Sequence, residues 1–117
     1  MKILICLILF LVSCGGSWTK EDTALQLTYT VLHVADWNQT LQIVDSEDHE
    51  ETNVILGRHP SKDEVNIYFA STLMAHYYVA HILPKPYRSY WQMVWIGIEY
   101  DVVRHNTRNG LSVNFKF

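Results

Sequence analysis

The side chains of this chain that could do acid–base or metal chemistry are carboxylates and imidazoles. The candidates are Asp36, Glu51, His59, His76, His81, Glu99 and Asp101. Helices that carry such groups on their inner faces can build a metal or acid–base site in the core of a bundle. His76 and His81 are five positions apart, however, so they do not share a helix face as residues four apart would. The spacing therefore predicts no metal site.

Complete catalytic motifs are missing from the sequence. His49-Glu50-Glu51 is followed by Thr52 and Asn53, so it is not the His-Glu-x-x-His pattern of zinc proteases. Neither a Gly-x-Ser-x-Gly motif nor a Walker-type phosphate loop occurs. We therefore expect no cofactor and a binding or structural role. A metal- or carboxylate-dependent membrane enzyme is the alternative.

A second group of polar residues lies at the end of a first helix and in the connection that follows it. This connection carries three consecutive aliphatic residues, Val54, Ile55 and Leu56. Left exposed, each would forfeit about 1.5–3 kcal/mol of burial free energy, so we expect all three to pack down. The flanking backbone would then need hydrogen-bonding partners. We predict a functional or purely structural cluster formed by Asp36, Gln39, Glu51 and Asn53, with His59 close by.

Three helices must position these groups, and we expect them over residues 22–44, 64–83 and 87–106. Thr19 can cap the first helix, and Ser61 with Glu64 reads as a capping box for the second. Pro84 and Pro86 separate the second helix from the third, so these two must form an antiparallel hairpin. Gly57 offers a turn with positive φ. The predicted fold is all-α: a membrane-associated three-helix bundle with a helical hairpin, after a signal peptide.

The relation of these helices to a bilayer is open from the sequence. The first is apolar nearly all round as far as Trp37, as helices buried in protein or in lipid are. The second and third are long enough to span, yet they carry ionisable groups, and a charge at mid-membrane costs at least about 2.5 kcal/mol. They either span or partly enter the membrane and hide those groups, or form a periplasmic bundle beside it.

The N-terminus carries the clearest targeting signal. Lys2 precedes an unbroken apolar run, Ile3–Val12, of the length of a signal-peptide core. Leu11-Val12-Ser13-Cys14 follows and resembles the bacterial lipobox, in which the peptide is cut before the Cys and the Cys is diacylated. The resemblance implies a lipoprotein signal peptide over residues 1–13, a tether over 14–21 and a single helical domain over 22–117. It places the protein on the bacterial cell membrane or outer membrane, facing the periplasm.

The numbers of cysteines and of charged residues limit the disulfides and the classes of binding partner that this chain can have. Cys6 and Cys14 are the two cysteines, and cleavage would remove Cys6, so the mature chain could form no internal disulfide. The net charge of −3 gives no electrostatic footprint for nucleic acid. The expected partners are membrane lipid, through Cys14, and other envelope proteins.

Three segments resemble an uncharacterised family of small helical envelope proteins of proteobacteria and tailed phages. They are Asp36-Trp37-Asn38-Gln39-Thr40, Glu51-Thr52-Asn53-Val54-Ile55-Leu56-Gly57-Arg58-His59-Pro60-Ser61, and Val65 with Tyr68-Phe69. The family pattern reads roughly Asp-x-x-Gln-Thr and then Glu-x-Asn-Pro-x-Leu-Gly-x-x-Pro-Ser, and this chain departs from it at Val54. The resemblance covers about residues 30–106. It implies a membrane-associated helical fold and no reaction; a phage-encoded lysis or superinfection-exclusion lipoprotein is a further alternative.

Overall fold

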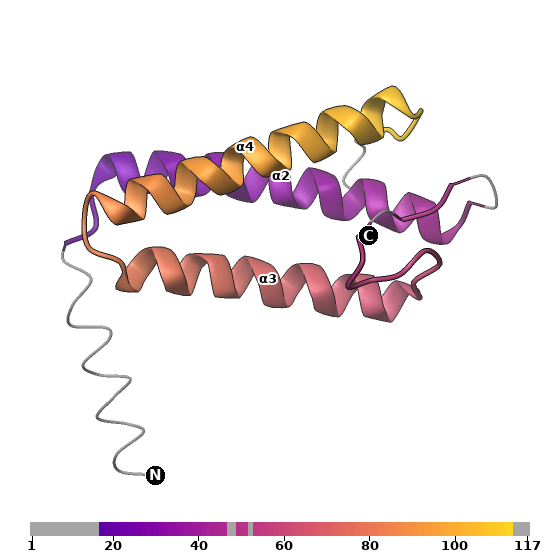
Figure 1. Cartoon of the computed structure of the whole chain (residues 1–117), viewed down its shortest axis with the longest axis horizontal. Coiled ribbons are helices and arrows are strands. Elements are labelled where there is room, and N and C mark those ends of the chain that lie inside the picture. Colours follow the sequence, from indigo (N-terminus) through magenta and orange to yellow (C-terminus); the bar gives the residue numbers. More distant parts are fainter. Residues whose placement is uncertain (1–16, 47–48, 52, 114–117) are drawn as a thin grey trace, which may run out of the picture.

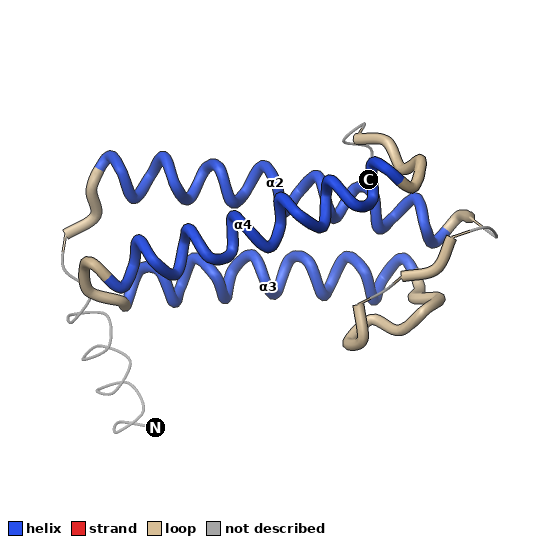
Figure 2. Tube along the Cα trace, turned by 45° about the horizontal axis from the view of Figure 1, so that its top comes forward, coloured by secondary structure: helices blue, strands red, loops and turns tan. Residues whose placement is uncertain are grey.

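The computed structural model describes residues 17–46, 49–51 and 53–113, and that part of the chain contains three helices and no strand. They are α2 (Lys20–Val44), α3 (Lys62–Ile82) and α4 (Tyr87–Arg108). Figure 1 shows them side by side, with α3 running antiparallel to both α2 and α4, and Figure 2 shows the same arrangement from another side. The all-α prediction is confirmed, with each boundary within two residues of its predicted place. The proposed signal peptide and Cys14 lie outside the described residues.

Local sequence signals explain where the helices begin and end. The Thr19 hydroxyl accepts from the backbone N–H of Asp22 (3.2 Å), and the Asp22 carboxylate accepts from the backbone N–H of Thr19 (2.8 Å). Ser61 caps α3 by accepting from the Glu64 backbone N–H at 3.1 Å. Gly57 has the predicted positive φ, 79°. Since α2 already begins at Lys20, the last residues expected in the tether belong to the helix.

The helices do not pack equally against one another. The α2 helix packs most extensively against α4 and less against α3, and α3 and α4 contact each other least. The apolar core is small: Leu41, Val65 and Phe69 are buried. They lie where α2 ends and α3 begins. This core therefore occupies only one end of the bundle, the end that carries the loop between α2 and α3.

Much of the remaining interior is polar. The buried polar and charged residues are Asp22, Gln26, His33, Asn38, Gln39, Thr40, His76, Arg88, Gln92 and Glu99. Large apolar side chains lie outside instead: Leu27 is 60% exposed, Val31 58%, Met74 72% and Val94 59%. This is the reverse of the usual distribution in water-soluble domains, where charged residues are almost never fully buried unless paired.

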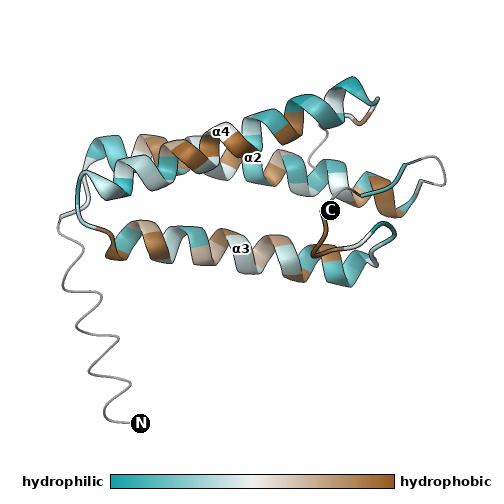
Figure 3. Cartoon of the chain, in the orientation of Figure 1, coloured by the Kyte–Doolittle hydropathy of each residue, from teal (hydrophilic) through white to brown (hydrophobic). Residues whose placement is uncertain are grey.

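The three helices share a zone without Lys, Arg, Asp or Glu, which we call the charge-free belt. It comprises residues 23–35 of α2, residues 65–82 of α3 with the adjoining 83–84, and residues 89–98 of α4. Charged residues lie at both ends of this belt; Figure 3 shows the matching pattern on α4, a hydrophobic middle between hydrophilic ends. Within the described part of the chain, no helix combines the length and apolarity needed to cross a membrane.

Candidate functional site: a buried cluster of ionisable side chains

His33 of α2 is the centre of the buried cluster. Its Nδ1 atom lies 2.6 Å from Oε1 of Glu99 on α4 and 3.1 Å from the Tyr29 hydroxyl. Its Nε2 atom lies 3.0 Å from the carbonyl oxygen of Phe69 and 3.1 Å from the hydroxyl of Thr72, both on α3. One imidazole thus joins all three helices, with an acceptor facing each ring nitrogen.

Asp36, one turn further along α2, faces a second carboxyl group. Asn106 and Thr40 donate to its Oδ1 at 3.2 and 3.4 Å. Burial, then the charge of Glu99 and a hydrogen bond between the two carboxyls, and then the charge of Glu51 raise the pKa of Asp36 to about 8. Asp36 therefore carries its proton at neutral pH and can donate it to Glu99, as paired carboxylates do when both cannot ionise.

Tyr29 and His76 extend the cluster along the bundle axis. Their rings stack with centroids 3.5 Å apart, and His76 also stacks on Trp91 at 5.5 Å. Burial, and then the charge of Glu99, raise the pKa of the Tyr29 hydroxyl. Burial, and then the charge of His33, lower the pKa of His76 to about 4. At neutral pH both side chains are uncharged.

The structure brings together only part of the cluster that we predicted from the sequence. Glu51 accepts from the backbone N–H of Asn53 at 2.9 Å, and its charge helps to raise the pKa of Asp36. Gln39 instead donates to the hydroxyl of Thr107 at 3.0 Å. His59 lies on the surface, 3.6 Å from Oε1 of Glu50.

The expected packing of the loop aliphatics is wrong for two of the three residues. Val54 is 94% exposed and Ile55 77%, whereas Leu56 packs on the apolar core. The cause is a turn over residues 54–56, in which Asn53 accepts from the backbone N–H groups of Ile55 (side chain, 2.9 Å) and Gly57 (carbonyl, 3.0 Å). The loop is nevertheless attached to α3, because the Asn53 amide donates to the Tyr68 hydroxyl at 2.8 Å.

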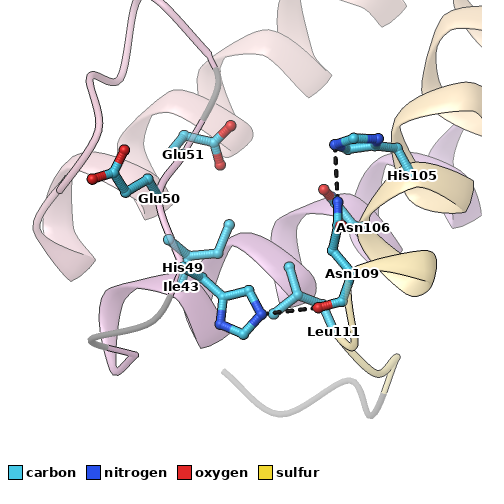
Figure 4. A pocket seen from close by; sticks show the side chains of 8 residues that line it. All are labelled: Ile43, His49, Glu50, Glu51, His105, Asn106, Asn109 and Leu111. Carbon is cyan, nitrogen blue, oxygen red and sulfur yellow. Dashed lines mark hydrogen bonds between the residues drawn. The ribbon is translucent and has the colours of Figure 1, made fainter.

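A pocket of about 320 Å³ lies between this loop and the end of α4 (Figure 4). His49 Nε2 is 2.9 Å from the carbonyl oxygen of Asn109, and the Asn109 amide is 3.0 Å from Nε2 of His105. Glu50 and Glu51 line the opposite wall in Figure 4. The pocket is polar, but its imidazoles already have partners.

Arg88 holds the opposite end of the bundle together. Its guanidinium donates to the Asp22 carboxylate (2.8 Å) and to the carbonyl oxygens of Ala80 (2.7 Å) and Ser17 (3.1 Å). Arg88 and Asp22 are both 0% exposed. Burial alone would raise the pKa of Asp22, but hydrogen bonds from Lys85, Thr19 and Arg88 lower it to about 2. This buried ion pair joins the start of α2, the last turn of α3 and the start of α4.

Sequence reasoning missed His33, Tyr29 and Arg88. A local signal exists for the first two: Tyr29, His33, Asp36 and Thr40 follow one another at spacings of three and four, which places them on one face of an apolar helix. Of the acidic and imidazole candidates, Glu99 and His76 join the buried core, and Asp101 is exposed. In the described residues, no group of three or more His, Cys, Asp or Glu side chains is arranged to hold a metal ion.

Comparisons of the chain with protein-family models, curated proteins and solved structures gave no match.

Proposed function

We propose that this protein is a lipid-anchored envelope protein, held by acyl chains on Cys14, whose helical domain lies partly embedded in the membrane and has a binding or structural role there. The observation that carries the proposal is the charge-free belt with its exposed apolar side chains. Beyond Leu27, Val31, Met74 and Val94, the exposed members of the belt are Ile67, Tyr77, Tyr78, Tyr90, Met93 and Ile98.

The energetics favour an apolar environment for these side chains. A large aliphatic or aromatic side chain gains roughly 1.5–3 kcal/mol when it leaves water. An exposed apolar surface that extends over several helices marks a contact with protein or membrane. Two grooves on this surface expose mainly apolar atoms. One is lined by Leu27, Val31 and Ile96 among others. The other is lined by Leu73, Met74 and Tyr77, with Gln26, Thr30 and His81 also among its lining residues. Such grooves suit acyl chains.

The site of lipidation supports the membrane as the partner. Only Gly15 and Gly16 separate Cys14 from Ser17. Three residue steps span at most about 11 Å, so the acyl chains must start close to Ser17. Arg88 fixes Ser17 to the bundle end, and the Arg88 guanidinium lies 5.1 Å from the ring centre of Trp18. The anchor therefore enters the membrane next to the end of the bundle at which the belt begins.

The distribution of charge agrees with partial embedding. At the anchored end Lys20, Glu21 and Lys85 lie near Tyr87 and Tyr90, a mixture that suits the headgroup layer. At the other end, Lys62, Asp63, Glu64, Asp101, Arg104 and Arg108 are all exposed. Between the two ends His33 and His76 are buried, whereas His81 lines the groove beside Leu73 and Met74.

Thiol accessibility tests this proposal in intact cell envelopes. We would introduce Leu27→Cys or Met74→Cys, with Arg104→Cys as the matched control, in the full chain, whose Cys14 thiol is blocked by acylation. A membrane-impermeant maleimide should modify Cys at position 104 at least tenfold faster than at 27 or 74, and detergent should remove the difference. Equal rates before detergent would refute membrane embedding.

A further inference from the structure

A small cavity lies beside the buried cluster, where α3 and α4 pack loosely against each other. Its volume is about 170 Å³. Pockets for drug-sized ligands measure roughly 300–1,000 Å³, so this cavity suits an occupant of a few non-hydrogen atoms. The side chains that decide its chemistry are Tyr29, Tyr68, His76, Trp91, Trp95 and Glu99.

His76 lines this cavity with both ring nitrogens unused. The residue is 3% exposed, and neither Nδ1 nor Nε2 has a hydrogen-bond partner among the described residues. Each buried polar atom left without a partner costs about 1–3 kcal/mol. Because burial and the neighbouring His33 keep His76 neutral, one of its nitrogens can accept a hydrogen bond from an occupant and the other can donate one.

The walls of the cavity have acidic character. Glu99 lines the cavity, and Asp36 lies directly behind Glu99. Neither Lys nor Arg is among the lining residues; His33 also lines the cavity, and its Nδ1 atom lies 2.6 Å from Oε1 of Glu99. An occupant with positive charge would be attracted by the Glu99 carboxylate, whereas an anion would be repelled by it.

Aromatic rings form much of the remaining wall of this cavity. Tyr29 and Tyr68 line one part of the wall, and Trp91 and Trp95 pack edge to face with centroids 5.5 Å apart. A cation over the face of such a ring gains roughly 0.5–2 kcal/mol, most over Trp and when it is desolvated. Aromatic rings, a carboxylate and a free imidazole nitrogen together form the chemistry that recognises an organic ammonium ion.

We propose that this cavity binds a small alkylammonium ion with at least one N–H group, of the kind found in ethanolamine. The N–H groups donate to His76 and to the Glu99 carboxylate, and the alkyl part packs against Trp91 and Trp95. A free amine and the headgroup of an ethanolamine lipid share this chemistry. Because the cavity lies within the bundle itself, binding of a free amine does not depend on the membrane contact proposed above.

The test uses full-length, ¹⁵N-labelled protein in detergent and follows the indole N–H signals by NMR during titration with ethylammonium chloride. The signals of Trp91 and Trp95 should shift and saturate, while those of Trp18 and Trp37 serve as internal references. Ethanol, which is neutral, and tetramethylammonium, which has no N–H, should bind at least tenfold more weakly. Equal affinity for ethylammonium and ethanol, or shifts that do not saturate, would overturn the proposal.

Variants separate a true site from a general effect of the amine. His76→Phe keeps a ring in the stack but removes both nitrogens, and should weaken binding at least tenfold; His81→Phe, on the same helix but outside this cavity, should leave it unchanged. Glu99→Gln should weaken the binding of ethylammonium as well. If Glu99→Gln does not fold, the result with His76→Phe alone tests the proposal. Unchanged affinity in His76→Phe would contradict the proposal.

A final arm distinguishes the two sources of the amine. The wild-type protein is placed in nanodiscs of phosphatidylglycerol with or without phosphatidylethanolamine. If the ethanolamine lipid shifts Trp91 and Trp95 as ethylammonium does, the ligand is the headgroup. If it does not, while free ethylammonium still binds, the ligand is a soluble amine.

Discussion

The Nδ1 atom of His33 lies 2.6 Å from Oε1 of Glu99, although 66 positions separate the two residues in the chain. This contact joins the middle of α2 to the middle of α4. Because both groups are buried, each would be left without its strongest partner if the other were removed. In such a buried pair, each group stabilises the fold mainly because it keeps the other from being buried without a partner.

A double-mutant cycle measures the interaction between these two residues. We expect His33→Gln and Glu99→Gln to be non-additive, with a coupling free energy of roughly 0.5–3 kcal/mol in denaturant unfolding. The exposed pair Glu50 and Arg58, whose charged atoms are 4.0 Å apart, is the control and should couple by less than about 1 kcal/mol. Additivity at His33 and Glu99 would show that the contact is not formed.

The Arg88–Asp22 ion pair should be a main source of stability. Replacing Arg88 by Met leaves the Asp22 carboxylate buried with one partner fewer and exposes orphan carbonyls at the end of α3, which we expect to cost about 3–5 kcal/mol. Arg104→Met, at an exposed position of α4, should change the free energy of unfolding by less than about 0.5 kcal/mol. Chemical denaturation followed by circular dichroism compares the two; similar midpoints would contradict the assigned role of Arg88.

Stability should fall as pH rises from 6.5 to 8. In the unfolded chain Asp36 ionises near 3.8, whereas in the folded protein its pKa is about 8. Between these values the folded state binds one more proton, so the free energy of unfolding decreases with pH, by at most about 1.4 kcal/mol per unit. His76 opposes this trend only between about 4 and 6.5, the interval from its folded to its unfolded pKa.

The variant Asp36→Asn isolates this effect. It should remove the slope between pH 6.5 and 8. It should leave unchanged the loss of stability as the pH falls from 3.8, the pKa of Asp22 in the unfolded chain, towards its folded pKa of about 2. Urea unfolding at several pH values gives both slopes. A slope that persists in Asp36→Asn would assign the titration to another group.

Lipidation at Cys14 is tested by metabolic labelling. Cells that express the wild-type chain should incorporate a clickable fatty acid into the protein, and cells that express Cys14→Ala should not. Cys6→Ala is the matched control, because cleavage would remove this residue, and it should label like the wild type. Equal labelling of wild type and Cys14→Ala would exclude the anchor.

The helices could be predicted because their signals are local. Each helix end is set by residues close to it in the chain. Thr19 and Asp22 cap the start of α2, Ser61 caps the start of α3, and Pro84 and Pro86 follow the end of α3. The polar core could not be predicted in the same way. Which face of α2 turns inward depends on α4, whose contacts with it lie some 66–70 residues away.

The helical spacing of Leu27 and Val31 predicts burial in protein or in lipid, and the bundle itself covers neither. Partners from α4 decide this outcome: Glu99 and Asn106 satisfy His33 and Asp36 on the opposite face of α2. For the loop cluster, the prediction joined Glu51 with Asn53 correctly. His59 lies on the surface beside Glu50, and the Glu51 backbone N–H donates to the carbonyl oxygen of the preceding residue, Arg58.

The unequal packing of the helices has a consequence for the order in which contacts form during synthesis. The α2 helix is made first, but its main partner, α4, is made last of the three. The ion pair between Asp22 and Arg88 can therefore form only after α4 has been made. Contacts between such distant segments form slowly. Until α4 has been made, Asp22 lacks its partner Arg88 and His33 lacks its partner Glu99. The three-helix arrangement thus stays open while the chain is being made, and it closes only once α4 is available to pack against α2.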